Sequence, residues 1–182
     1  MTARKLKAVE TEDPVDRIPI GEVVKYLSGL GLFRGIRNKP EALAYFAEKM
    51  HEENFAKGKN IFSIGDMDDR MFCLMQGEAE VTKVTLDGDH FRVAVLKAED
   101  GAVFGEGALL DADSRSATIK ALVDCRCLVM DRKTFHTVCE EYPGWALPVL
   151  NQIAWAVMDR LRRLNGDFTL LYSALVKQIR GE

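Results

Sequence analysis

The chain has 182 residues, of which 47% are hydrophobic and 29% are charged, and its formal net charge is −3. This balance is typical of a globular protein with one domain and accessory segments. The small negative charge excludes a protein that is drawn as a whole to nucleic acid or to an anionic membrane. No apolar run approaches the roughly 20 residues that span a bilayer. The N-terminus lacks the apolar stretch of a secretory signal, so we expect a cytoplasmic protein.

Two helices are predicted after an N-terminal tail. Residues 1–16 are polar and charged, which is typical of a mobile segment. Residues 21–30 carry apolar side chains at helical spacing, and residues 40–50 begin with a proline at an early helical position. We therefore assign residues 17–53 to N-terminal helices.

Between residues 54 and 142 the sequence changes to short β-type segments separated by glycines. Asp87-Gly88 is a strong hairpin signal, because glycine accepts the positive φ of a tight turn. Many short strands with regular turns predict an antiparallel roll with a cavity. A short helix follows at 133–142. The expected strands are 60–64, 71–75, 79–85, 91–96, 116–122 and 126–130.

A long helix is predicted after Pro143-Gly144, which ends the preceding helix and gives the chain a hinge-like break. Its apolar residues recur in steps of three and four, a heptad pattern sustained over about four repeats. A helix of about 30 residues is roughly 45 Å long, more than a small domain covers. We therefore assign residues 143–182 to a long C-terminal dimerisation helix and expect the chain to form a homodimer through residues 147–175 of it. The alternative is a helix packed along its own barrel. The heptad residues are Leu147, Leu150, Ala154, Val157, Leu161, Leu164, Phe168, Leu171 and Leu175.

The sequence contains no recognisable metal site or catalytic constellation. The cysteines lack the spacing of zinc ligands, and we interpret them as reduced thiols used as small hydrophobic residues: Cys73, Cys125, Cys127 and Cys139. The histidines are isolated from one another and from any nucleophile motif: His51, His90 and His136. We therefore expect that the chain binds no metal and is not an enzyme.

The candidate site lies in residues 101–118. Gly105 and Gly107 permit close backbone approach, and a helical turn after Glu106 would point its amides at an anion. Arg115 supplies a planar cation suited to two phosphate oxygens at once. The Glu106 carboxylate supplies acceptors that suit a sugar hydroxyl. Such a site fits a ligand with a single phosphate charge and a free ribose hydroxyl.

This stretch resembles the phosphate-binding cassette of the cyclic nucleotide-binding domain family, which includes the catabolite activator protein and the regulatory parts of cyclic-nucleotide-dependent kinases. The family pattern Phe-Gly-Glu-x-Ala-Leu stands here at 104–109, and Arg-small-Ala at 115–117. Similar patterns extend from about residue 30 to 165. The resemblance implies a mainly β fold with flanking helices: an antiparallel, jelly-roll-like β-roll over 54–142, N-terminal helices and a long C-terminal helix.

The resemblance also implies a ligand, cyclic AMP or cyclic GMP, and roles for single residues. Glu106 would hold the ribose 2′-hydroxyl. Arg115 would hold the exocyclic phosphate oxygens, with help from Ser116 and the amide of Ala108. Apolar side chains on the strands would contact the ribose or the base. The implied ligand-binding set is Phe104, Gly105, Glu106, Gly107, Ala108, Arg115, Ser116, Ala117, Val81, Val95 and Arg160.

Two departures from the family pattern bear on affinity and base preference. Gly107 stands where the family usually has a larger aliphatic residue, so we expect a looser cassette helix. The base-contacting region of the long helix falls near Arg160, with Arg163 a turn later. An arginine there could stack over a purine or donate to its N7 or O6 atoms; the alternative is a solvated helix surface. The choice between adenine and guanine stays open.

We interpret the chain as a stand-alone, non-catalytic cyclic nucleotide sensor that signals through helix movement to an unknown effector protein. The chain ends at Glu182 without the helix-turn-helix segment that follows the long helix in the activator proteins. We therefore expect no direct DNA binding and no membrane association. The alternative is a degenerate interaction module that binds no nucleotide, in which Glu106 and Arg115 form an internal pair.

Overall fold

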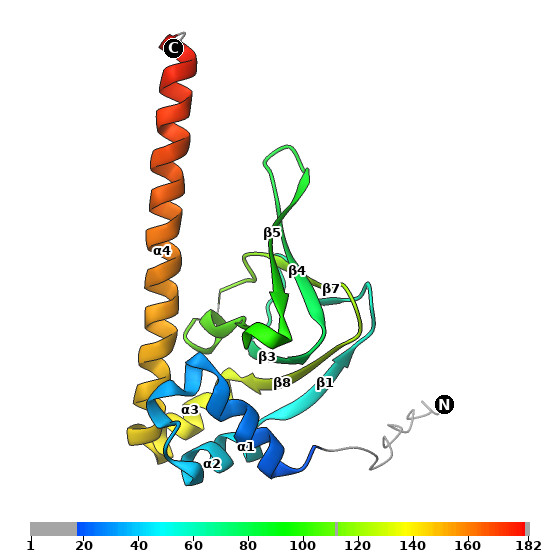
Figure 1. Cartoon of the computed structure of the whole chain (residues 1–182), viewed down its shortest axis with the longest axis vertical. Helices are drawn as coiled ribbons and strands as arrows, with labels where there is room; N and C mark the ends of the chain where they lie inside the picture. The colour runs from blue at the N-terminus through cyan, green and yellow to red at the C-terminus, as the bar shows by residue number, and fades with distance from the viewer. Residues whose placement is uncertain (1–17, 112, 181–182) are drawn as a thin grey trace, which may run out of the picture.

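The computed structural model describes residues 18–111 and 113–180. Short helices gather at one end of the molecule, two sheets form its middle, and one long helix, α4 (Pro143–Arg180), runs past the sheets (Figure 1). The tail expected over residues 1–16 lies outside the described residues. None of the helices in the described ranges is long and apolar enough to cross a membrane.

The N-terminal helices bury one apolar face each. They are α1 (Ile20–Gly29), the 3₁₀ helix η1 (Gly31–Ile36) and α2 (Pro40–Lys49). Pro40 stands at the start of α2, where its missing N–H costs no hydrogen bond. The apolar residues of these helices pack together and against one face of the first sheet. Both helices predicted from the sequence are present.

All strand pairs are antiparallel, as the glycine-punctuated sequence predicts. The strand order of the first sheet is β1 (His51–Phe55), β8 (Cys125–Asp131), β3 (Arg70–Gln76), β6 (Val103–Phe104). That of the second sheet is β2 (Asn60–Phe62), β7 (Thr118–Ala121), β4 (Glu78–Val84), β5 (His90–Lys97). The mainly β roll with flanking helices is confirmed. The predicted hairpin joins β4 to β5, and Gly88 has a φ of 90° in its turn.

The first sheet separates two apolar cores. Met71 and Cys73 of β3 face the helices, whereas Phe72 and Leu74 of the same strand face the second sheet. Successive side chains of a strand point to opposite faces, so a strand covered on both sides is apolar throughout. This burial explains why the sequence of β3 shows no polar alternation.

The cysteines are all free thiols. Three of them lie buried in strands, and burial raises the pKa of Cys127 to about 12. These thiols therefore stay protonated at neutral pH and act as small apolar side chains. Within the described ranges, no group of three or more His, Cys, Asp or Glu residues is placed to hold a metal ion.

The predicted break before the long helix is a helix boundary. The helix α3 (Arg132–Glu141) begins at Asp131, whose carboxylate accepts a hydrogen bond of 2.7 Å from the amide of Thr134. Tyr142 alone separates α3 from α4, which starts at Pro143.

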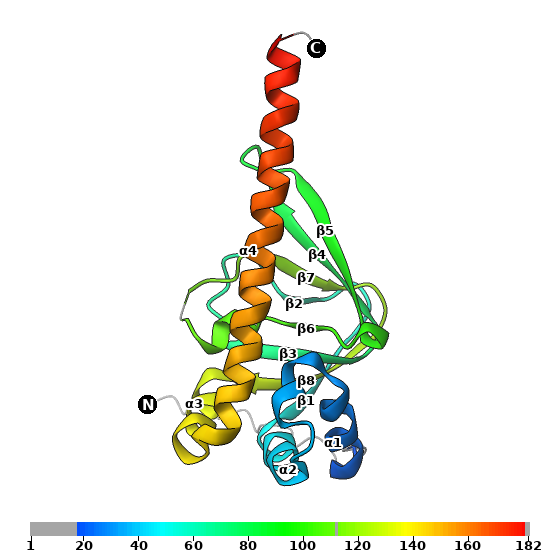
Figure 2. The same ribbon diagram turned by 60° about the vertical axis from the view of Figure 1, so that its left-hand side comes forward.

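The two parts of α4 differ in burial. Ala146, Val149 and Ile153 are buried, and a side chain at Gly35 of η1 would lie 2.5 Å from the Cβ of Pro148. The helix is therefore packed closely at its start. From Val157 onwards, the apolar heptad residues are between 42% and 70% exposed. Figure 2 shows α4 running alongside the sheets and then extending beyond them.

Two strands, β1 and β6, were not predicted from the sequence. The β1 segment, His-Glu-Glu-Asn-Phe, is mostly polar and shows no alternation of apolar and polar residues. Its two glutamates are nevertheless partly buried, because arginines pair with them. Glu53 pairs with Arg70 at 2.7 Å, and Glu52 with Arg126 at 2.5 Å. The boundary expected between residues 53 and 54 falls inside this strand. The other strand, β6, has only two residues and carries no periodicity.

Candidate functional site

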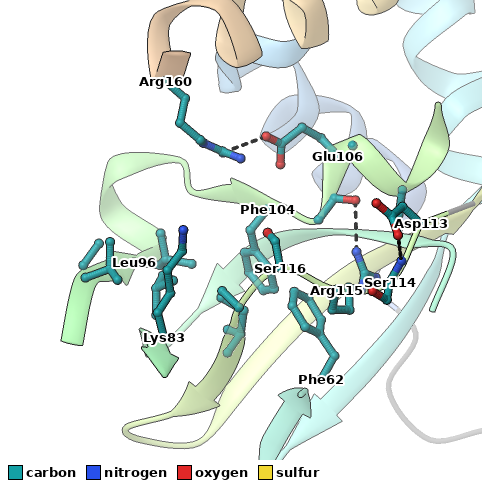
Figure 3. Close-up of a pocket in the computed structure, with 18 of the residues that line it drawn as sticks. Phe62, Lys83, Leu96, Phe104, Glu106, Asp113, Ser114, Arg115, Ser116 and Arg160 are labelled. Atoms are coloured by element: carbon teal, nitrogen blue, oxygen red, sulfur yellow. Dashed lines mark hydrogen bonds and ion pairs between the residues drawn. The ribbon is translucent and has the colours of Figure 1, made fainter. Parts of the chain in front are cut away.

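A cavity of about 490 Å³ lies between the second sheet, the η3 turn (Glu106–Leu109) and α4 (Figure 3). This volume is in the range of small-molecule sites. Its lining includes every residue of the set expected from the sequence except Val95. Residues separated by more than 70 positions in the sequence, Val81 on β4 and Arg160 on α4, thus come together around one space.

The glycines of the cassette differ in what the structure requires of them. Gly105 has a φ of 73°, and a Cβ there would lie 2.8 Å from Nη1 of Arg115. Only glycine fits this position without strain. A Cβ at Gly107 would have no neighbour within 4 Å, so a larger residue would fit there. Packing therefore does not require a glycine at position 107, where the family usually has a larger aliphatic residue.

Arg115 is almost completely buried, with 6% of its surface exposed. Its Nη2 lies 3.2 Å from the carboxylate of Asp68 and donates to the carbonyl of Arg70. Nη1 donates to the carbonyl of Gly105 at 3.3 Å, and the guanidinium lies 4.0 Å from the ring centroid of Phe62. Nε is buried with no hydrogen-bond partner among the described residues. One donor of this cation is therefore unsatisfied.

The charges around Arg115 form a network. Burial lowers the pKa of Arg115, while the nearby carboxylate of Asp68 opposes that shift. Burial also acts to raise the pKa of Asp68, but hydrogen bonds from Arg70 and the charge of Arg115 lower it overall. Arg70 is itself held by Asp68 at 2.9 Å and by Glu53 at 2.7 Å. The carboxylate of Asp68 is therefore ionised at neutral pH and holds the two arginines in place.

Glu106 is the other buried charge of the cavity, also 6% exposed, and its partner comes from α4. Its Oε1 accepts from Nη2 of Arg160 at 2.8 Å, as Figure 3 shows. The Arg160 side chain is 65% exposed. The internal Glu106–Arg115 pair considered from the sequence is not formed, because each of the two residues has a different partner. Arg163 pairs with Asp159 at 2.9 Å instead and does not line the cavity.

Arg132 connects the cassette to α3 and was missed in the sequence analysis. Its Nε donates to the carbonyl of Ala108 at 2.7 Å, and its Nη2 donates to the carbonyl of Asp111. These carbonyls lie at the end of η3, where a helix leaves its acceptors without partners. No sequence signal distinguishes Arg132 from a solvated residue at a helix start.

The β4–β5 wall of the cavity differs from the expected one. A β-bulge between Val81 and Thr82 shifts the register, so that Val81 lies opposite Ala94. Val93, Ala94 and Leu96 line the cavity, whereas Val95 lies opposite Glu80, outside the cavity lining. Lys83, also missed, lines the cavity two residues after Val81. Because side chains two residues apart on a strand lie on the same face, the placement of Val81 in the cavity wall would have predicted Lys83 there as well.

Known proteins similar to this chain over most of its length support the resemblance to the cyclic nucleotide-binding domain family. The chain is 23% identical over 158 residues to the CRP-like cAMP-activated global transcriptional regulator of Mycobacterium tuberculosis, covering 84% of this chain and 67% of that protein. It is 31% identical over 116 residues to the cAMP-dependent protein kinase regulatory subunit of Dictyostelium discoideum, covering 63% of this chain and 35% of the subunit. The chain thus spans about two thirds of the first relative and about one third of the second.

Solved structures share the fold. The crystal structure of Thermus thermophilus catabolite activator protein matches with a TM-score of 0.69 and 27% identity, covering 78% of this chain and 62% of that one. The model of one family, the cyclic nucleotide-binding domain, matches residues 52–142, which run from the second residue of β1 through β8 and α3 and include the cassette. The chain therefore belongs to the cyclic nucleotide-binding domain family.

Proposed function

We propose that the chain is a non-catalytic sensor that binds a 3′,5′-cyclic nucleotide in the cavity beside η3. One observation carries this proposal: two oppositely charged residues, Arg115 and Glu106, are both buried and line the same cavity. Burying charge is costly unless partners compensate it. A buried cation and a buried carboxylate at separate points of one cavity suit a ligand with a phosphate and a sugar hydroxyl.

The proposed roles follow the chemistry of each group. Arg115, whose Nε has no partner in the described structure, binds the exocyclic phosphate oxygens together with Ser116 and the amide of Ala108. Glu106 accepts from the ribose 2′-hydroxyl. Phe104, Gly105, Gly107, Ala117 and Val81 complete the wall. We leave Val95 out of the proposed site. Two relatives, a cAMP-activated transcriptional regulator and a cAMP-dependent protein kinase regulatory subunit, support the ligand class.

Isothermal titration calorimetry with cyclic AMP and cyclic GMP tests the proposal. We expect micromolar or tighter binding, about −8 kcal/mol. Non-cyclic 5′-AMP is the control, because its dianionic phosphate does not match a single arginine, and it should bind far more weakly. If neither cyclic nucleotide gives heat or a thermal shift up to millimolar concentration, the sensor function is wrong.

We further propose that α4 carries the output of the sensor. Its exposed apolar residues follow a heptad, and burying such a seam between two copies removes apolar surface from water at about 25 cal/mol per Å². The start of α4 is packed against η1, whereas Arg160 reaches into the cavity. A ligand that competes for Glu106 would shift α4 and, through the dimer, an effector protein.

The second candidate function is an interaction module that binds no nucleotide. A specific observation favours it: both buried charges already have partners in the protein, Asp68 for Arg115 and Arg160 for Glu106. A closed network of this kind could hold the cavity in shape without any ligand. The calorimetric titration separates the two functions, because only the sensor binds a cyclic nucleotide.

A further inference from the structure

Lys83 is a cation without a counter-charge at the wall of the cavity. It lies on β4, two residues after Val81 and so on the same face of the strand. It lines the cavity and is half-buried. Within residues 18–111 and 113–180, no hydrogen bond or ion pair joins its side-chain ammonium to another residue. The ammonium of Lys83 can therefore donate hydrogen bonds to a ligand in the cavity.

Lys83 lies on the side of the cavity away from the proposed phosphate site. Figure 3 shows Lys83 and Leu96 on one side, Arg115 with Asp113 on the other, and Arg160 above. In a 3′,5′-cyclic nucleotide the phosphate ring is fused to the ribose, so the base projects away from the phosphate. A phosphate on Arg115 therefore directs the base towards Leu96 and the Lys83 ammonium.

Arg160 adds a second donor at this end of the cavity. Its Nη2 is bound to Glu106, and the other two nitrogens of its guanidinium have no partner in the described part of the chain. Lysine and arginine side chains donate hydrogen bonds and accept none. The carboxylates of the cassette loop that line the cavity are those of Asp111 and Asp113, and Figure 3 places Asp113 on the Arg115 side. Glu106, the third carboxylate that lines the cavity, is bound to Arg160 and is the proposed partner of the ribose. The groups left for the base at this end, the Lys83 ammonium and the remaining guanidinium nitrogens of Arg160, are donors.

Donors of this kind distinguish the two purines. Guanine presents two neighbouring acceptors, O6 and N7, on one edge, whereas adenine presents N7 beside a donating amino group. An adenine amino group facing two cations would lose its bond to water and gain no acceptor. We infer that Lys83, together with Arg160, selects guanine over adenine, so that the ligand of this site is cyclic GMP. This inference rests on the proposed function.

Calorimetry with three cyclic nucleotides on the full chain tests the selection. Cyclic GMP should bind about 10- to 100-fold more tightly than cyclic AMP. Cyclic IMP, which keeps O6 and N7 but lacks the 2-amino group, should bind like cyclic GMP. Cyclic IMP that binds like cyclic AMP would assign the preference to the 2-amino group and contradict the role of Lys83.

Variants at Lys83 separate a contact from a general effect of charge. Lys83→Met keeps the apolar stem and removes the ammonium, so the preference for cyclic GMP should fall about tenfold or more, while the affinity for cyclic AMP stays the same. Lys83→Arg keeps the donors and should keep the preference. The matched control is Lys120→Met, which removes the same charge from an exposed position of β7, next to the cavity-lining Ile119. It should change neither affinity.

The outcomes distinguish this inference from the function on which it rests. Equal binding of cyclic GMP and cyclic AMP contradicts the inference and leaves the sensor function intact. A preference that survives Lys83→Met also contradicts it. The absence of binding of all three nucleotides up to millimolar concentration overturns the sensor function itself, and the inference with it.

Discussion

The two buried charged residues of the cavity, Arg115 and Glu106, are equally buried, but they are held by different parts of the chain. Every contact described for the Arg115 guanidinium lies within the β-roll: Asp68, Arg70, Gly105, Phe62 and Phe72. Glu106 is bound instead by Arg160, seven residues after Ile153, the last buried residue of α4. One end of the site is thus fixed by the sheets, and the other depends on where α4 lies.

We expect this difference to separate the residues that set affinity from those that carry a response. A site fixed by the sheets should change little when a ligand binds. An ion pair to an exposed helix can exchange one partner for another, and a ligand shifts a conformation only if it binds the two states differently. We expect changes at Arg115 to act mainly on affinity, and changes at Arg160 to act mainly on the response of α4.

The largest expected effect is that of Arg115→Leu. Removing one member of a buried pair costs roughly 3–5 kcal/mol, which corresponds to about two to four decades in affinity. The loss should be similar for every cyclic nucleotide, because the phosphate is common to them, and calorimetry measures it. The control is Arg163→Leu, which removes an arginine that is 79% exposed on α4. A comparable loss in the control would mean that general charge, not the buried site, determines affinity.

A double change in the α4 seam should convert dimers into monomers. Leu161→Glu with Phe168→Glu places like charges on the exposed heptad face, where both residues contact water in the single chain. Leu164 is left unchanged because it also lines the cavity. Light scattering measures the mass. The control is Leu170→Glu, about half a turn around the helix from Leu161 and 70% exposed, which should keep the dimer. An unchanged mass in the double variant would rule out this seam.

Glu106→Gln should cost less affinity than Arg115→Leu. A hydrogen bond to a charged group is worth about 1.5–3 kcal/mol, or roughly 10- to 100-fold. The variant should also shrink the preference for a cyclic ribonucleotide over its 2′-deoxy analogue. Titrating both ligands into wild type and variant measures this preference. If Glu106→Gln keeps full sugar discrimination, the ribose assignment is wrong even though the ligand class can stand.

Arg160→Leu should uncouple α4 from the cassette. In wild type, a cyclic nucleotide should change the hydrogen exchange of amides in residues 132–165 as well as in the cassette, because the ligand competes for the partner of Arg160. In the variant, the change should remain in the cassette and fall several-fold in α4. A response of wild type confined to residues 101–111 and 113–118 would identify a rigid module and contradict the proposed helix movement.

The smallest expected effect is that of Gly107→Ala. Alanine fits the space at this position and reduces the freedom of the unfolded chain, so the free energy of unfolding should rise by about 0.4–1 kcal/mol. Thermal unfolding of the free protein measures it. Gly105→Ala is the matched comparison: it places a Cβ 2.8 Å from Arg115 in a left-handed backbone and should destabilise the protein. Destabilisation by both changes would show that the space at Gly107 is needed.

The sequence predicted which residues line the cavity better than it predicted their long-range partners. The glycines, Glu106 and Arg115 lie within a dozen residues, and their types alone indicate an anion beside a sugar. The partners that fix their orientation lie far away in the sequence, at Asp68 and Arg160. Nothing in a local pattern states which of several arginines an acid contacts.

The missed elements have equally specific causes. Strand β1 escaped prediction because its acids are paired with arginines and show no apolar alternation. Val95 was assigned to the wall from the family resemblance, whereas the register shift between Val81 and Thr82 leaves Val95 opposite Glu80 and outside the cavity lining. The β4–β5 hairpin was predicted despite its bulge, because Asp87-Gly88 marks its turn in the sequence.

The hydrogen bonds that Arg132 donates to the cassette couple the cassette to α3, so that the two should move together. Because Arg132 is the first residue of α3 and holds two carbonyls of the cassette, η3 cannot slide against α3 without breaking those bonds. Only Tyr142 lies between α3 and α4, and its ring stacks on Trp145 with a centroid separation of 4.1 Å. We therefore expect a small translation of the cassette to rotate the base of α4, and the length of that helix to enlarge the displacement at its far end.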